Sequence, residues 1–408
     1  MRISSQQYFS MNVANMSNQQ AQLSQIYQEI SSGQSLTTPA DNPLGAAQAV
    51  QLSSTAAALS QYTTNQTAAL TSLQAEDSTL STVITTLQSA NTLGLRAGNG
   101  GLNDADRTAI AAQLTTLRDQ LLSYANATDG SGNALFAGFQ NSTQAFSTDA
   151  AGNVTYTGDT GSRTVQVTDS NAVATGDNGL AVFMSVGAIN AQPIAAGNSA
   201  NTGSGVIGGV SIKDPTNAGN ADAYQIQFSG SGSSLTYTIT DTTTGVAGTP
   251  QAYTSGSDIT IAGQTVQISG TPAANDTFTV QPANKASTNV FANLNAMITA
   301  LQQPVSGNPA AAATLQNALN TGLSQLGNTL DNITAVQASV GGREQEVKAL
   351  QTVTQTNSLQ TQSNLADLTQ TDMVSTISKY TMQQAALQAS QQAFVKIQNM
   401  SLFQYIGS

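Results

Sequence analysis

The chain of 408 residues is too long for one compact core, so we expect two or three domains. It contains no Cys and no His, which removes disulfides, thiolate or imidazole metal sites and the usual catalytic bases and nucleophiles. Its 11 basic residues against 22 acidic ones, with no basic cluster, disfavour binding to nucleic acid. We therefore expect no enzyme, no metal or cofactor site and no nucleic-acid partner.

The beginning of the chain shows no targeting segment of the usual kind. Residues 1–6 lack the apolar core of a secretory signal peptide, and no run approaches the length of about 18 apolar residues that a membrane span needs. We therefore expect no membrane insertion. If the protein leaves the cell, we expect it to do so without a cleaved signal peptide.

Residues 1–32 contain no Gly or Pro and are predicted to form a helix. Their large apolar residues recur in steps of three and four, with Gln20 as the one polar gap, which indicates a single apolar stripe. Only Arg2, Glu29 and Asp41 are charged before residue 76, too few to keep an isolated amphipathic helix soluble. We therefore expect the stripe to be buried against a partner. It consists of Phe9, Val13, Met16, Leu23, Tyr27 and Ile30.

Residues 46–93 follow a proline-containing turn, contain no helix breaker and carry leucine at nearly every seventh position. This pattern predicts a long helix that belongs to a bundle. Asn103 or Asp104 is expected to cap a third helix that returns antiparallel, and the glycine-rich turn after it is expected to open a β-hairpin that reaches Phe139. The helical pattern resumes at Phe291, so these segments can close an inner helical bundle.

The region between the two halves of this bundle has a different composition. From about Thr148 to Ala286, helical periodicity gives way to short runs that alternate between apolar and polar residues, such as Tyr224 to Phe228. Every acidic residue in the region is Asp, which suits turns better than helices. We therefore predict an inserted β-rich domain.

Residues 343–406 again contain neither Gly nor Pro, so we expect one long helix or two that are nearly collinear. Apolar residues recur every seven positions from 373 to 394, which is the pattern of a heptad seam. A stripe this narrow cannot be buried by its own helix, and the N-terminal helix is the expected partner. The seam residues are Met373, Ile377, Tyr380, Leu387 and Phe394.

Together these patterns predict an α+β multidomain protein with long terminal coiled-coil helices and an inner helical bundle that carries an inserted β-rich domain. Three domains are expected. They are a terminal coiled-coil assembly domain (1–45 and 365–408), a helical rod domain with a β-hairpin (46–147 and 286–364) and an outer β-rich domain (148–285).

Two further patterns have plain structural explanations. The string from Gly203 to Gly208 fits G-x-G-x-x-G, but Pro215 prevents the helix that should follow a dinucleotide-binding turn, so we expect a flexible loop. Glu344 and Glu346 lie beside Arg343 and Lys348, which is typical of a solvated helix face.

Short motifs at the two ends of the chain support a family assignment. At the front they are Met1-Arg2-Ile3-Ser4, Ile30-Ser31-Ser32-Gly33 and Pro39-Ala40-Asp41-Asn42-Pro43; at the back they are Val340-Gly341-Gly342-Arg343 and the run from Leu365 to Ile406. In combination they resemble the flagellin family of bacterial flagella, although Asn42 stands where the family commonly has a second Asp. Within the family, Leu135-Phe136-Ala137-Gly138-Phe139 and Leu402-Phe403-Gln404-Tyr405-Ile406 are similar to the members that join hook to filament.

This resemblance implies an extracellular structural subunit at the hook–filament junction of the bacterial flagellum, exported unfolded through the flagellar type III channel. It implies an export chaperone as a partner before secretion. After secretion, the implied partners are the first hook-associated protein, flagellin subunits and other copies of the chain in a ring. The resemblance also adds Leu402 and Phe403 to the expected assembly interface.

Alternatives remain open at this point. A filament flagellin belongs to the same family and should form long polymers alone. A protein of another class could use the β-domain to bind a glycan or a host surface, with the helices as a stalk. An enzyme that acts through Asp residues of the β-domain is a third and weaker hypothesis.

Overall fold

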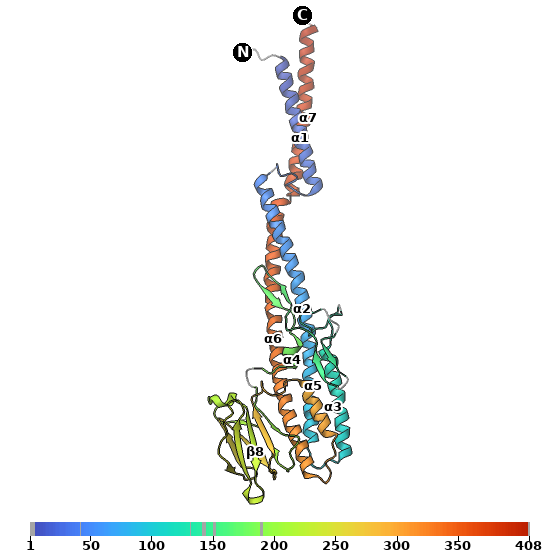
Figure 1. The fold of residues 1–408 in the computed structure, drawn as a ribbon. Coiled ribbons are helices and arrows are strands. Elements are labelled where there is room, and N and C mark those ends of the chain that lie inside the picture. The colour runs from blue at the N-terminus through green and yellow to red at the C-terminus, as the bar shows by residue number, and fades with distance from the viewer. Residues whose placement is uncertain are drawn as a thin grey trace. The chain divides into compact units, whose positions relative to one another are not determined.

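The computed structural model describes residues 5–40, 42–130, 132–140, 144–149, 152–187 and 191–406. The chain divides into two compact units, a terminal unit (1–64 and 350–408) and an inner unit (65–349). The predicted α+β class, with long terminal helices, a helical bundle and a β-rich insertion, is confirmed (Figure 1). The division into three domains stays a prediction.

The terminal unit contains the paired helices α1 (Ser5–Ser32) and α7 (Met373–Ile406). It also includes the first part of α2 (Pro43–Ala97) and the last part of α6 (Pro309–Thr369), which both extend into the inner unit. Helix α1 is followed by Gly33, whose φ of 69° lies in the left-handed region that glycine tolerates.

A β-bridge between Gln34 and Gln370 separates α6 from α7. Beside it, the N–H of Ser35 donates to the carbonyl of Thr369 over 2.8 Å, which ties the end of α6 to the loop after α1. The Asp372 carboxylate then accepts from the backbone N–H two residues on, over 3.0 Å, and caps α7. From the sequence, this segment could form either one helix or two. The contact with the loop after α1 divides it into two helices, although neither Gly nor Pro stands at the break.

The inner unit is built on α2, α3 (Asp104–Ala125), α5 (Val290–Leu301) and α6. Asn103 and Asp106 form a capping box, so the predicted start of α3 is confirmed. The helices approach closely at Gly94, where a Cβ would lie 2.8 Å from the side chains of Leu323 and Met297. The bundle core includes Leu73, Leu80, Leu87, Leu114, Leu121, Leu319 and Leu326.

Residues 126–187 form short elements that pack against these helices. The predicted β-hairpin is limited, among the described residues, to one bridge between Thr128 and Ala134, so the prediction that it reaches Phe139 was wrong. The next residues turn inward instead: the Phe136 ring is fully buried and packs edge-on against Phe183, with ring centroids 5.3 Å apart. The elements that follow are the hairpin β1 (Phe146–Thr148) and β2 (Val154–Tyr156), the hairpin β3 (Thr164–Gln166) and β4 (Ala172–Ala174), and α4 (Gly179–Phe183).

Two antiparallel sheets then form a sandwich. The five-stranded sheet has the order β10-β9-β8-β13-β5, and the smaller sheet has the order β11-β12-β6 with β7 also paired to β12. Rings of Phe228 and Phe278, 5.7 Å apart, fill the space between the sheets together with Ile226 and Ile268. The strands are β5 (Ile194–Gly197), β6 (Val206–Ile207), β7 (Ser211–Ile212), β8 (Tyr224–Ser229), β9 (Thr236–Asp241), β10 (Gln251–Ala252), β11 (Asp258–Ile261), β12 (Gln264–Ser269) and β13 (Thr277–Gln281); two short 3-10 helices, Ala218–Ala221 and Gly232–Ser234, lie between them.

The glycine-rich string from Gly203 to Gly208 is held in place, so the prediction of a flexible loop was wrong. The carboxylate of Asp276, only 2% exposed, accepts from the N–H groups of Thr202 and Gly203 over 2.8 and 3.0 Å. A Cβ at Gly203 would lie 2.3 Å from the backbone nitrogen of Ala273, so the glycine permits a close approach of two chain segments. Strand β6 lies within the string, and no helix begins there to hold a phosphate.

The β3–β4 hairpin, which falls within the predicted outer domain, is bound to a helix of the inner unit. The side chains of Asn65 and Gln66 on α2 donate to two successive backbone carbonyls of the β3–β4 hairpin, over 2.7 and 2.8 Å. The predicted outer domain began at residue 148. We propose instead that it begins at about Ile194, the first residue of the sandwich.

Amide side chains on α6 fix the sandwich to the helix. Asn317, 3% exposed, donates to the carbonyl of Gly205 over 2.9 Å and accepts from the N–H of Ile207 over 2.8 Å. Asn320, three residues further along, donates to the carbonyl of the same Ile207 over 2.9 Å. The attachment is therefore directional and carries no net charge.

We expect Asn317→Ala to lower the free energy of unfolding by about 1–3 kcal/mol, because it leaves a buried N–H and a buried carbonyl of the sandwich without partners. Urea unfolding measures this change, and hydrogen exchange of residues 204–208 should speed up. Asn364→Ala is the matched control, since Asn364 lies exposed on the same helix. If both variants lose the same stability, the amide attachment does not hold the sandwich.

Candidate functional site

The candidate site is the surface of the α1 and α7 pair, which Figure 1 shows side by side. The rings of Phe9 and Phe394 lie 5.1 Å apart, and those of Tyr27 and Tyr380 lie 6.4 Å apart. Near the second pair, the amide of Gln383 donates to the amide oxygen of Gln22 over 2.8 Å. The helices therefore run antiparallel, and the predicted stripes face each other.

The predicted seam residues are brought together, yet this pairing leaves none of those that the structure describes fully buried. Exposure is 45% for Phe9, 61% for Tyr27 and 47% for Ile377. Val13 and Met373 are also exposed, whereas the half-buried ones are Met16, Leu23, Ile30, Tyr380, Leu387 and Phe394. Leu402 and Phe403 belong to α7, but their side chains lie outside the described residues.

The terminal unit has no apolar core of its own among the described residues. Every buried hydrophobic residue of the described chain lies between Ala69 and Val347, in the inner unit. In contrast, of the 18 large hydrophobic residues that are exposed in the described part of the chain, 13 lie in the terminal unit. They are Phe9, Met11, Val13, Tyr27, Leu44, Val50, Val353, Leu359, Met373, Val374, Ile377, Met382 and Val395.

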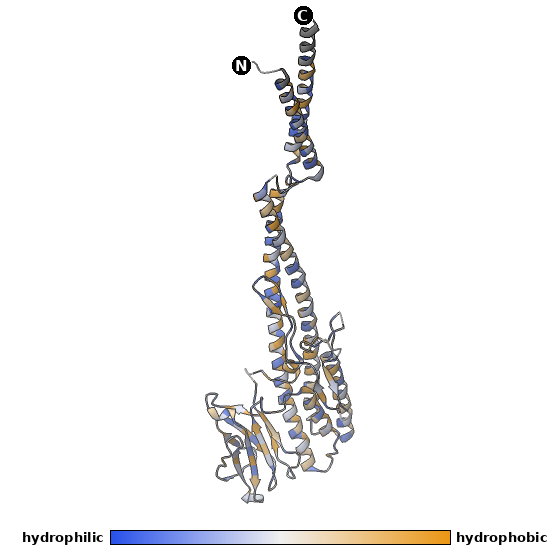
Figure 2. Cartoon of the chain, turned by 45° about the horizontal axis from the view of Figure 1, so that its top comes forward, coloured by the Kyte–Doolittle hydropathy of each residue, from blue (hydrophilic) through white to orange (hydrophobic). Residues whose placement is uncertain are grey.

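The sequence pattern missed several of these residues because they lie off the seam. Val374 is 82% exposed and Met382 is 65% exposed, both on α7. Figure 2 shows orange, hydrophobic residues recurring along α1 and α7. A search for periodicity finds only the face that two helices share. The scarcity of charge along the whole segment is the signal that could have indicated the other faces.

Charge contributes little to this surface. Helix α1 contains one charged residue, Glu29, and α7 contains two, Lys379 and Lys396. All ion pairs between described residues lie in the inner unit. The interactions that this surface offers are therefore apolar contacts and neutral hydrogen bonds, both of which depend only weakly on salt.

Metal-binding groups and membrane-spanning helices were sought in the described part of the chain. It contains no group of three or more His, Cys, Asp or Glu residues placed to hold a metal ion. None of its helices combines the length and hydrophobicity that crossing a membrane requires.

Two family models match this chain, one over its N-terminal helical region and one over the sandwich. Residues 3–141 match the family described as the bacterial flagellin N-terminal helical region. Residues 196–282, which cover the sandwich, match the family described as the D2-like domain of flagellar hook-associated protein 1. The second match begins within the first strand of the sandwich, two residues after that strand starts at Ile194.

Solved structures with the same fold include FlgL of Xanthomonas campestris, 27% identical, with a TM-score of 0.68, covering 76% of this chain and 98% of that one. The flagellar hook-associated protein 3 of Legionella pneumophila is 27% identical, with a TM-score of 0.70, covering 78% of this chain and 98% of that one.

Full-length relatives decide the family. The flagellar hook-associated protein 3 of Escherichia coli is 30% identical over 405 residues, which is 99% of both chains. The protein of the same name from Salmonella typhimurium is 30% identical over 404 residues, again 99% of both chains. These relatives support neither a filament flagellin nor a glycan- or host-binding protein. The chain therefore belongs to the flagellar hook-associated protein 3 family.

Proposed function

We propose that this protein is a non-catalytic structural subunit of the extracellular flagellum that joins hook to filament through its terminal unit. One observation carries the proposal: the terminal unit exposes 13 large hydrophobic residues and, among those described, buries none. A surface of this kind is typical of a protein interface that forms only on assembly. The names of the relatives, hook-associated protein 3 and flagellar junction protein FlgL, support the same role.

We infer that other copies of the chain cover the terminal helices in a ring. The first hook-associated protein lies on one side of this ring and flagellin on the other. Burying apolar surface contributes roughly 25 cal/mol per Å², so each residue left open by the α1–α7 pair adds to the stability of the ring. The half-buried and exposed seam residues serve this contact, and so do Leu402 and Phe403.

We further propose that the protein is exported without a cleaved signal peptide and that a chaperone covers the terminal helices beforehand. An apolar surface of this size would otherwise associate in the cell. The absence of Cys supports this route, since no disulfide can form in transit.

Two leucine variants separate folding from assembly. Leu80, in the core of the inner unit, is 0% exposed, so Leu80→Ala should lower monomer stability by about 2–5 kcal/mol. Leu387 on α7 is only half-buried by its partner helix, so Leu387→Ala should leave monomer melting nearly unchanged and impair incorporation into the flagellum. Calorimetry of the monomer and the amount of protein recovered in purified hooks measure the two effects.

Gln391→Ala is the control for this experiment, because Gln391 is an exposed polar residue on the same helix. It should change neither melting nor incorporation. An equal loss of monomer stability from Leu80→Ala and Leu387→Ala would contradict the proposed division between an inner folding unit and a terminal assembly unit.

Removal of the sandwich tests whether assembly needs it. Ile194 and Gln281 are paired residues on neighbouring strands, so a short Gly/Ser linker can replace everything between them. We expect the shortened protein to be exported, to fold as a helical protein and to retain filaments on the hook. Motility and filament retention in a strain that carries only this variant provide the measurement. Loss of filaments despite export and folding would show that the sandwich is part of the joint.

A further inference from the structure

A buried carboxyl group on α2 has a hydrogen-bond partner at only one of its two oxygens. Glu76 is 1% exposed. Its Oε1 accepts from the backbone N–H of Asp177 over 3.0 Å, whereas its Oε2 has no hydrogen-bond partner. Removing an ionised carboxylate from water without full hydrogen bonding is unfavourable, so this site favours the protonated form.

The charges around Glu76 add to this preference. The Asp177 carboxylate lies beside it and forms an ion pair with Arg343 of α6, so one guanidinium faces two carboxyl groups. Burial, and after it the charge of Asp177, raises the pKa of Glu76 to about 8. Arg343 and Glu344 were predicted to lie on a solvated helix face, and that prediction was wrong for both, since their side chains are only 15% and 14% exposed. Glu344 accepts from Lys348 over 2.8 Å.

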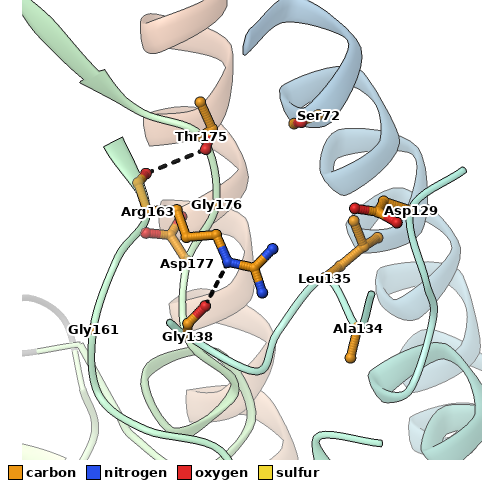
Figure 3. A pocket seen from close by; sticks show the side chains of 10 residues that line it. All are labelled: Ser72, Asp129, Ala134, Leu135, Gly138, Gly161, Arg163, Thr175, Gly176 and Asp177. Atoms are coloured by element: carbon orange, nitrogen blue, oxygen red, sulfur yellow. Dashed lines mark hydrogen bonds between the residues drawn. The ribbon is translucent and has the colours of Figure 1, made fainter. Parts of the chain in front are cut away.

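Other charged side chains near Glu76 form hydrogen bonds with groups outside the cluster. The next residue on α2, Asp77, accepts from the Gln337 amide of α6 over 3.0 Å. A cavity of about 40 Å³ lies here. Figure 3 shows Asp177 and Arg163 on one side of it and Asp129 on the other. Arg163 donates to the carbonyl of Gly138 over 2.9 Å. A cavity of this size accommodates water beside the carboxyl cluster.

Glu76 and Arg343 both form hydrogen bonds with one hairpin, which contacts α2 and α6. We call residues 163–177, which contain β3 and β4, the flap. Arg343 donates to the flap carbonyl of Ala174 over 3.3 Å, and Glu346 accepts from the flap residue Asn171 over 2.7 Å. The same flap receives the two amide hydrogen bonds from α2 described above. A change at Glu76 therefore acts on a segment that touches both long helices.

We propose that Glu76, Asp177 and Arg343 form a pH-sensitive clasp that keeps the flap on α2 and α6 at low pH and releases it as the pH rises. Opening of the flap exposes Glu76 to water, where the carboxyl group loses its proton at its ordinary pKa of 4.5. Between 4.5 and about 8 the closed flap keeps a proton that the open flap releases, so the open population increases by about tenfold per pH unit. Above about 8 both forms are ionised, and the increase ends.

Hydrogen exchange measures the opening directly. Flap peptides of the full-length protein are compared at pH 5.5, 7.0 and 8.5 with sandwich peptides from 224–241, which cancel the intrinsic pH dependence of exchange. In the wild type, protection of the flap relative to the sandwich should fall by about tenfold per pH unit up to 8. Glu76→Gln, which is neutral at every pH, should abolish this slope. The control Glu346→Gln, which removes a carboxylate that contacts the flap from α6, should keep it.

A titration keeps the proposal testable if Glu76→Gln fails to fold. The chain contains four glutamates, so selective ¹³C labelling of the glutamate carboxyl groups gives four signals, and single Gln variants of the other three assign them. The Glu76 signal should titrate near 8. A midpoint near 4.5, or a flap whose relative protection does not change with pH, would overturn the clasp.

Discussion

The terminal helices form a pair that is too small to bury its own hydrophobic residues. Two antiparallel helices share one seam, and every apolar side chain off that seam stays in water until a further surface covers it. Phe9 and Phe394 touch each other, yet Phe9 remains 45% exposed. The inner unit has no such deficit, because its four helices enclose leucines such as Leu80 on all sides. The proposed assembly role follows from this difference between the two units.

Neutral amide groups supply much of the specificity inside the inner unit. Asn317 and Asn320 attach the sandwich to α6, and Asn65 and Gln66 attach the β3–β4 hairpin to α2. An amide side chain donates and accepts, so it can satisfy both groups of a peptide without placing a charge in the interior. Contacts of this kind require neither a metal nor a disulfide. The Glu76 cluster is the exception, and it makes the attachment of the flap depend on pH.

The sequence analysis failed where one segment fixes another that is distant in the chain. Phe136 was assigned to a hairpin because a turn precedes it, but its ring packs against Phe183, 47 positions later. The glycine-rich string was expected to be flexible, but Asp276, just before β13, holds it through two hydrogen bonds. Arg343 was expected in solvent, but the flap covers it. In each case the deciding contact is non-local, and local residue patterns contain no information about it.

The sequence by itself determined the periodic features and the excluded chemistry. Heptad spacing predicted the terminal helices, alternation predicted the sandwich strands, and the absence of His and Cys argued against common catalytic and metal sites. These properties depend on spacing and composition, which one chain displays without its fold. Only the tertiary structure decided where α6 ends, since the bond between Ser35 and Thr369 joins positions 334 residues apart. Only the tertiary structure, likewise, brought Glu76, Asp177 and Arg343 together, because burial and charge proximity arise when three separate segments pack.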